Sequence, residues 1–173
     1  MERKLVALSF DDGPSNVTEK VLDILEENGV VATFFLIGEQ VTPEVKGTLE
    51  RQLKLGCELA NHSWTHSQMN EMTPEQINKE IDDTTNIIKE IAGVDVKFFR
   101  PPYLAVSNTM YQNIDVPFIQ GIGCDDYMDS VSADQRVRTV LNNASDGAII
   151  LLHDFQGNNN TVAALPRIIQ GLR

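Results

Sequence analysis

The stretch "KLVALSFDDGPS", Lys4 to Ser15, changes character abruptly after Phe10. Its first seven residues are almost continuously apolar, as in a strand of a parallel sheet that is buried on both faces. Two aspartates and a Gly-Pro pair follow at once, and such residues are typical of a turn. The stretch therefore predicts a buried strand that carries two carboxylates at its carboxyl end.

Similar apolar runs recur along the chain, at Val30–Gly38, Cys57–His62, Val96–Arg100, Pro117–Gly123 and Ala148–Asp154. Amphipathic patterns between these runs indicate helices, because apolar residues return at intervals of three and four. We expect helices from about Val17 to Gly29, from Thr42 to Gly56, after the capping boxes Thr73–Gln76 and Ser132–Gln135, and from about Thr161. Pro166 should interrupt the last helix, because proline cannot donate a backbone hydrogen bond.

The alternation of strand and helix predicts the fold class. Such a chain forms a parallel sheet with helices outside, either open or closed into a barrel. A regular eightfold barrel usually needs about 250 residues, so 173 residues can form only a shorter and irregular one. We expect a single domain that covers residues 1–173.

Composition excludes some partners. The net charge is −11, from 25 acidic and 14 basic residues, so nucleic acid and an anionic membrane surface would both repel the chain. The opening "MERKLVALSF" lacks a signal-peptide pattern, and no apolar run approaches the length of a membrane span. The protein is therefore either cytosolic or a domain of a longer secreted polypeptide. Cys57 and Cys124 are either bridged or two buried thiols.

Polar residues collect where the predicted strands end. The clusters are "DDGPS", "NHSWTH", "RPPY", "DDY" and "HD". Each has an ordinary explanation by itself: a turn, a surface arginine or a histidine of the core. However, the carboxyl ends of parallel strands meet at one face, which carries the active site in such folds. Since all three histidines of the chain fall in these clusters, we reject coincidence and predict one site.

The residue types in these clusters suit metal-assisted hydrolysis. His62 and His66 have a common spacing of zinc ligands, and one of the two aspartates would complete a set of three that leaves a position open. The other aspartate would accept a proton from the attacking water, with Arg100 keeping it ionised. His153 would protonate the leaving group. These residues predict a hydrolase that attacks a carbonyl group with activated water.

At these motifs the sequence resembles the polysaccharide deacetylase family, the NodB-homology domain of carbohydrate esterase family four. The similar segments are "SFDDGPS", "HSWTH", "RPPY", "DDY" and "LLHD", in the family's order and through nearly the whole chain. The resemblance implies an irregular, incomplete (β/α) barrel of about six to seven parallel strands. It also implies one divalent metal ion, expected to be zinc, with cobalt or another ion as alternatives.

The resemblance implies a role for each residue of the site. Asp11 would be the base, oriented by Arg100. Tyr103 would supply its backbone N–H to an oxyanion hole and would contact the substrate. Asp126 would tune the acid His153. The remaining roles are metal binding by Asp12, His62 and His66, and substrate binding by Leu152, lining the acetyl pocket, and Tyr127.

Two departures from the family pattern bear on the substrate and the fold. Tyr127 stands where the family usually has tryptophan, which changes the pocket wall. The chain stops at "IIQGLR", where relatives commonly add one more short strand, so it is either trimmed or open at that seam.

Among subgroups, "NHSWTHSQMNEM" and "KFFRPPY" resemble acetylxylan esterase modules. We therefore expect an extracellular monomer, or one module of a larger enzyme, that removes O-acetyl groups from acetylxylan. The alternatives are an N-deacetylase of chitin or peptidoglycan and a sugar-binding module without catalysis. Asp11, Asp12 and His153 are all present, which disfavours the binding module.

Overall fold

The computed structural model describes residues 4–173 and shows an α/β fold around a parallel sheet. Its four strands are β1 (Ala7–Gly13), β2 (Ala32–Leu36), β3 (Glu58–Asn61) and β4 (Ile149–His153), in the order β3-β2-β1-β4. In the register of the sheet, Ser9 of β1 lies opposite Thr33 of β2 and Leu151 of β4. The predicted α/β class and the burial of the first strand are thus confirmed.

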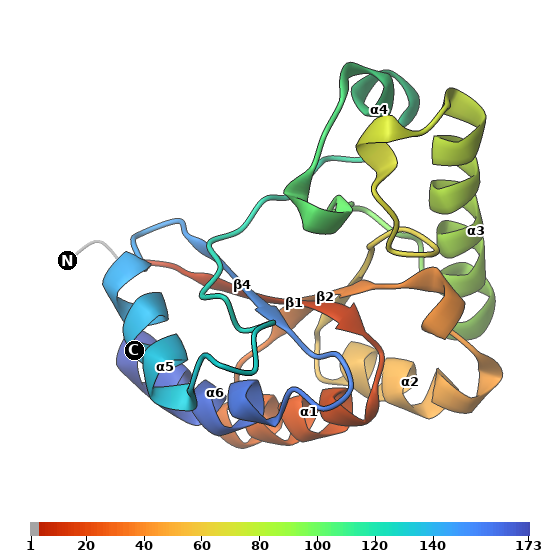
Figure 1. Ribbon diagram of the computed structural model, residues 1–173. Helices are drawn as coiled ribbons and strands as arrows, with labels where there is room; N and C mark the ends of the chain where they lie inside the picture. Colours follow the sequence, from red (N-terminus) through yellow and green to blue (C-terminus); the bar gives the residue numbers. More distant parts are fainter. Residues whose placement is uncertain (1–3) are drawn as a thin grey trace.

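The helices are arranged in two groups. They are α1 (Asn16–Asn28), α2 (Lys46–Lys54), α3 (Pro74–Ala92), α4 (Asn108–Asn113), α5 (Ala133–Asn143) and α6 (Asn159–Leu172). Figure 1 shows α1, α2, α5 and α6 along one face of the sheet, whereas α3 stands at one side next to α2, and α4 packs against α3. Short 3-10 turns occur at Gly38–Gln40, Pro43–Val45, Met69–Glu71 and Pro102–Leu104. Within residues 4–173, no helix has the length and hydrophobicity needed to cross a membrane.

Local sequence signals set several helix ends. Thr73 with Gln76, and Ser132 with Gln135, form the predicted capping boxes of α3 and α5. Gly29 ends α1 in the left-handed region, with φ of 60°. The second predicted helix starts as a 3-10 turn before α2, and the short α4 was not predicted.

The predicted interruption at Pro166 is wrong. Helix α6 runs continuously from Asn159 to Leu172 with this proline inside it. Pro166 lies on the exposed side of α6, where water can solvate the carbonyl group that loses its hydrogen bond.

The strands predicted at residues 96–100 and 117–123 are not present as regular strands. These runs take part in single parallel bridges, Asn61 to Phe99, Phe99 to Phe118 and Ile122 to Ile150. Proline lacks a donor for a strand ladder and glycine weakens a strand. Pro101 follows the first run directly, and the second run begins with Pro117 and contains two glycines. The sheet of the described residues therefore has four regular strands, and the expected barrel of six to seven is not confirmed.

The core explains the stability of this arrangement. One large apolar cluster fills the space between the sheet and the helices, and a smaller one lies around α3 and α4, made of Met69, Ile77, Phe99, Met110 and Ile114. Cys57 and Cys124 are buried as free thiols, so they are not bridged. Burial raises the pKa of the Cys124 thiol to about 12, which makes this cysteine an inert core residue.

Candidate active site

A cavity of about 480 Å³ opens at the carboxyl ends of the strands. All five predicted polar clusters contribute to its wall, as expected for a parallel fold. The predicted residues that line it are Asp11, Asp12, His62, His66, Tyr103, Asp126, Tyr127 and His153. The lining residues that the sequence did not predict are Pro101, Leu104, Gly123, Asp125 and Leu151.

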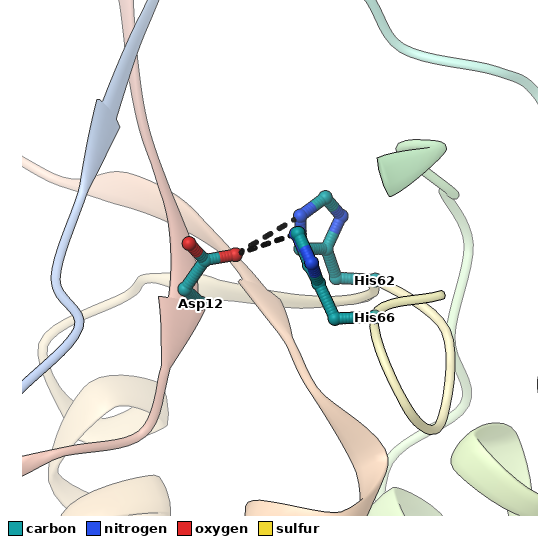
Figure 2. A group of neighbouring side chains, drawn as sticks. All are labelled: Asp12, His62 and His66. Atoms are coloured by element: carbon teal, nitrogen blue, oxygen red, sulfur yellow. Dashed lines mark ion pairs between the residues drawn. The ribbon is translucent and has the colours of Figure 1, made fainter. Parts of the chain in front are cut away.

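Asp12, His62 and His66 converge on one point of this cavity (Figure 2). Asp12 comes from β1, and the two histidines come from the loop that follows β3. The Asp12 Oδ1 atom lies 3.2 Å from the Nε2 atom of each histidine. His62 Nδ1 lies 2.7 Å from the backbone oxygen of Arg100, so this ring is held with Nε2 toward Asp12.

The geometry of this group fits a divalent metal ion. The three ligand atoms lie within 4.8 Å of one another. Asp12 Oδ1 is buried, yet it accepts no hydrogen bond of good geometry from a described residue. A buried acceptor without a donor is unusual in a folded protein and suits a bound cation. Two imidazoles and a carboxylate are ligands for zinc and for similar divalent ions.

The electrostatics of the group point the same way. Burial alone raises the pKa of the Asp12 carboxyl, but His62 and His66 outweigh it and hold this pKa well below its ordinary value. Burial alone lowers the pKa of the His62 ring, yet the Asp11 and Asp12 carboxylates raise it above its ordinary value. These atoms therefore attract positive charge, whether a proton or a cation carries it.

Helix α3 holds the loop that carries both histidines. The buried Glu80 carboxylate accepts hydrogen bonds from the backbone N–H groups of Trp64, at 2.8 Å, and Thr65, at 2.9 Å. It also accepts one from the Thr65 hydroxyl at 2.9 Å. Within the loop, the His66 N–H donates to Ser63 Oγ at 3.0 Å. These contacts thus fix the backbone of the loop from which both rings extend.

Asp11 forms a buried ion pair beside this group. Its Oδ1 atom accepts a hydrogen bond from Arg100 at 2.6 Å, and both side chains are almost fully buried. Arg100 also donates to the Ser9 hydroxyl at 2.9 Å and stacks over the Phe35 ring at 4.1 Å. The other oxygen, Asp11 Oδ2, lies 3.7 Å from His62 Nε2. Asp11 therefore faces the metal-binding group with one oxygen and the arginine with the other.

His153 and Asp126 form a second pair in the same cavity. His153 Nδ1 lies 2.7 Å from Asp126 Oδ1, and the His153 backbone N–H donates to Asp126 Oδ2 at 2.8 Å. Burial alone lowers the pKa of the His153 ring, but the hydrogen bond and charge of Asp126 raise it to about 9. The ring is therefore protonated at neutral pH, as a proton donor requires.

Unusual backbone conformations collect around the cavity. In the described part of the chain, six residues other than glycine have positive φ, and all lie in the cavity wall or its loops: Asp12, Ser63, His66, Tyr103, Leu104 and Asp125. Tyr103 has φ of 59° and its exposed ring contacts the His66 ring at 4.8 Å between centroids. Left-handed conformations are unfavourable for such residues and persist where surrounding contacts impose them, which is common at functional sites.

One predicted site residue does not reach the cavity. Leu152 is fully buried in the apolar core, whereas its neighbour Leu151 lines the cavity. Side chains alternate between the two faces of a strand, so Leu151 shares the cavity side with His153. The same alternation places Ser9 on the side of Asp11. Sequence reasoning missed Ser9, although its position two residues before Asp11 was a usable signal.

Comparisons with known proteins agree with this site. The family model for polysaccharide deacetylase matches residues 1–116. The chain is 60% identical over 171 residues to a bifunctional xylanase/deacetylase of Pseudobutyrivibrio xylanivorans, covering 99% of this chain and 28% of that protein. It is 35% identical over 172 residues to the peptidoglycan-N-acetylglucosamine deacetylase PgdA of Listeria monocytogenes, covering 98% of this chain and 36% of the relative.

A solved structure resembles the whole fold. A family 4 acetyl xylan esterase from Clostridium thermocellum, in complex with a cobalt ion, superposes with a TM-score of 0.95 at 44% identity. The match covers 98% of this chain and 83% of that one. By contrast, the chain spans only about a third of the length of the two curated relatives.

Proposed function

Because this chain belongs to the polysaccharide deacetylase family, we propose that it is a metal-dependent hydrolase that removes O-acetyl groups from acetylxylan. One observation carries this proposal. A candidate metal group, Asp12 with two histidines, has the Asp11–Arg100 pair beside it and the His153–Asp126 pair in the same cavity. A hydrolase of acetyl groups needs these three functions together.

The roles follow from the surroundings of each side chain. When bound by Asp12, His62 and His66, a divalent ion would polarise the acetyl carbonyl and acidify a water. Asp11 accepts the proton of the attacking water, because Arg100 holds one oxygen of this carboxylate at 2.6 Å and leaves the other oxygen facing the site. His153 donates a proton to the leaving oxygen of the sugar, because Asp126 keeps its ring charged.

The walls of the cavity support the acetyl group and the sugar. We assign the Tyr103 backbone N–H as the donor to the developing oxyanion. Tyr103 lines the cavity, and its left-handed backbone conformation is of the kind that surrounding contacts impose at functional sites. Leu151 provides an apolar surface for the acetyl methyl group. The exposed ring of Tyr127, with its centroid 5.9 Å from that of His153, offers a stacking surface for a sugar ring.

Zinc is the ion we propose for the site. A carboxylate and two imidazoles suit zinc, and the same ligands accept cobalt. The acetyl xylan esterase of similar structure contains a cobalt ion, so both metals belong in the test.

A neutral xylan chain is the substrate that the charges favour. The net charge is −11, and among residues 4–173 the cavity wall includes aspartates but no lysine or arginine. An anionic polymer would therefore be repelled. The similarity to a xylanase/deacetylase supports the same choice. The second candidate is an N-deacetylase of N-acetylglucosamine polymers, favoured by the 35% identity to a peptidoglycan deacetylase.

Acetate release distinguishes these candidates. The measurement is kcat/KM on acetylated xylo-oligomers and on N-acetylglucosamine oligomers of equal length, at equal loading with zinc or cobalt. We expect a higher value on the xylo-oligomers. A higher value on the amino-sugar oligomers would favour the N-deacetylase, and no acetate from either series would overturn the proposed activity.

We further propose that the chain works outside the cell as a monomeric module of a longer xylan-degrading enzyme. The support is its match to only 28% of the length of the xylanase/deacetylase. For the fold, we propose that the single bridges at Phe99, Phe118 and Ile122 join the two edges of the sheet into an irregular, incomplete barrel.

A further inference from the structure

Two arginines are among the largest fully buried side chains of the protein, Arg100 and Arg136. Arg100 pairs directly with Asp11. Arg136, in α5, forms no ion pair with a carboxylate of the described residues. A buried charge without a direct partner is costly unless hydrogen bonds compensate it, so the contacts of Arg136 require an explanation.

Arg136 donates only to neutral groups. It reaches the backbone oxygens of Val131, at 2.9 Å, and Met128, at 3.0 Å. Its NH1 group also donates to Asn158 Oδ1 at 2.6 Å and to Thr161 Oγ1 at 2.8 Å. Asn158 precedes α6 and Thr161 lies in its first turn, so the guanidinium group connects α5 to the start of α6.

These contacts fix the direction of the next hydrogen bonds. A guanidinium group is a donor and never an acceptor, so the Thr161 oxygen must accept from it. The single hydroxyl hydrogen of Thr161 is then left for Asp126 Oδ2, at 2.8 Å. In the same way the Asn158 oxygen faces Arg136, and its amide nitrogen donates to the backbone oxygen of His153 at 2.9 Å.

The hydrogen bonds of Asp126 in turn determine which of its oxygens faces the His153 ring. Its Oδ2 atom accepts from the Thr161 hydroxyl, from the His153 backbone N–H and, at 3.4 Å, from Asn158. The Oδ1 atom is thereby left for the His153 ring, at 2.7 Å from Nδ1. Since an ionised carboxylate only accepts, Nδ1 carries a hydrogen and Nε2 is the nitrogen available to the cavity.

We propose that Arg136 and Thr161 are positioning residues for His153, acting through Asp126 to fix the orientation and tautomer of its ring. This inference rests on the proposed role of His153 as the proton donor. Arg136 does not contact the His153 ring, so it would orient the hydrogen bonds of Thr161 and Asp126 and take no part in proton transfer. The other charged groups near His153 are Asp11 and Asp12, at the end of β1, and neither is altered by changing Thr161.

A matched pair of variants separates positioning from simple packing. Thr161→Val keeps the shape but loses the hydroxyl, whereas Thr161→Ser keeps the hydroxyl and loses a methyl group. If positioning matters, Thr161→Val lowers kcat for acetate release by about 10- to 100-fold, which is the usual effect of removing a group that orients a functional side chain. Thr161→Ser should keep a kcat close to that of wild type. KM and metal affinity should remain unchanged in both, because the cavity wall and Asp12, His62 and His66 are untouched.

The ring of His153 can be observed directly. The chain has three histidines, so 15N NMR of the zinc-loaded protein resolves His153 from the other two. In wild type and Thr161→Ser we expect a hydrogen held on Nδ1. In Thr161→Val we expect a mixture of neutral tautomers above the pKa of the ring. This signal reports on positioning even if wild type releases no acetate, which would refute the proposed function alone.

Two results would overturn the inference. The first is wild-type kcat and an unchanged His153 spectrum in Thr161→Val. The second is an equal loss of kcat in Thr161→Ser that follows a loss of thermal stability, because that pattern indicates packing alone. If Thr161→Val does not fold, Thr161→Ala is the second variant without a hydroxyl, compared with Thr161→Ser in the same measurements.

Discussion

Asp11 and Asp12 are adjacent in the chain, yet their carboxylates have different partners. Asp11 Oδ1 accepts from Arg100 at 2.6 Å, whereas Asp12 Oδ1 lies 3.2 Å from the Nε2 atoms of two histidines. The left-handed conformation of Asp12, with φ of 74°, separates the two side chains. Two identical residues therefore have different surroundings, which suit one to the proposed binding of a cation and the other to the proposed acceptance of a proton.

The first prediction concerns metal binding. His66→Ala should weaken zinc binding by at least about 100-fold, because it removes one of three protein ligands. Mutation of a residue that only orients a metal ligand can already reduce metal affinity by up to about 100-fold. Calorimetric titration of the metal-free protein measures this, with one site expected in wild type. His153→Ala is the control and should bind zinc normally. Unchanged affinity in His66→Ala would remove this histidine from the ligand set.

The second prediction separates the base from the ligands. Asp11→Asn should retain metal but lower kcat by about 10²–10⁴-fold, because an amide cannot accept the proton of water. It should also reduce stability, because Arg100 would keep its buried charge without the ion pair. Steady-state rates at saturating zinc test the first effect and urea unfolding tests the second. Full activity in this variant would require a different base.

The third prediction concerns the alkaline limit of activity. In its proposed role His153 donates a proton in its charged form, and its pKa of about 9 places the expected loss of rate near that pH. Asp126→Asn removes the charge that raises this pKa, so the fall in kcat should move to lower pH. Rate profiles between pH 6 and 10 measure the shift. An alkaline limb that does not move would exclude His153 as the titrating acid.

The fourth prediction concerns stability and pH. Asp154 is fully buried and its Oδ1 atom has no hydrogen-bond partner among residues 4–173. Burial raises its pKa from 3.8 to about 7, despite the hydrogen bond from Thr18. Since the folded pKa is raised, the stabilising contribution is complete below pH 3.8 and is lost as the pH rises through 7.

Asp154→Asn cannot ionise and should escape this loss. Relative to wild type, the metal-free variant should gain on the order of 1–4 kcal/mol in free energy of unfolding between pH 4 and pH 8. Urea unfolding at both pH values measures the difference. Asp129→Asn, at an exposed position, controls for the removal of a charge. Parallel stability curves for wild type and Asp154→Asn would contradict the prediction.

The fifth prediction tests the support behind the histidine loop. Glu80→Gln keeps the shape of the side chain but replaces one acceptor oxygen with a donor, which conflicts with the N–H groups of Trp64 and Thr65. Zinc affinity should fall by about 10-fold or more, as for other residues that orient ligands. Glu75→Gln, exposed on the same helix, is the control. Equal affinities would show that the loop holds its shape without Glu80.

The sequence revealed what depends on near neighbours. Buried strands and capping boxes are local patterns, so β1 to β4 and the starts of α3 and α5 were predicted. The polar clusters were placed at one face because parallel strands share their direction. Leu151 could have been chosen over Leu152, because strand alternation with His153 already indicated it.

Contacts between distant residues were beyond such patterns. Arg136 and Thr161 are 25 positions apart, and Glu80 lies 15 positions from Thr65. On their own helices these residues resemble ordinary surface positions, and only tertiary packing buries them. The runs 96–100 and 117–123 were overpredicted because their composition favours a strand, while Pro101 after the first run and Pro117 at the start of the second disfavour a regular ladder.

The left-handed residues around the cavity determine where this site can be altered. At Asp12, His66, Tyr103, Leu104 and Asp125, most substitutions must also satisfy an unfavourable backbone, so mutational libraries there will yield few folded variants. Leu151 and Tyr127 line the same cavity with ordinary backbone angles. Evolution of a new acyl or sugar preference, natural or directed, therefore has its open routes at these two residues.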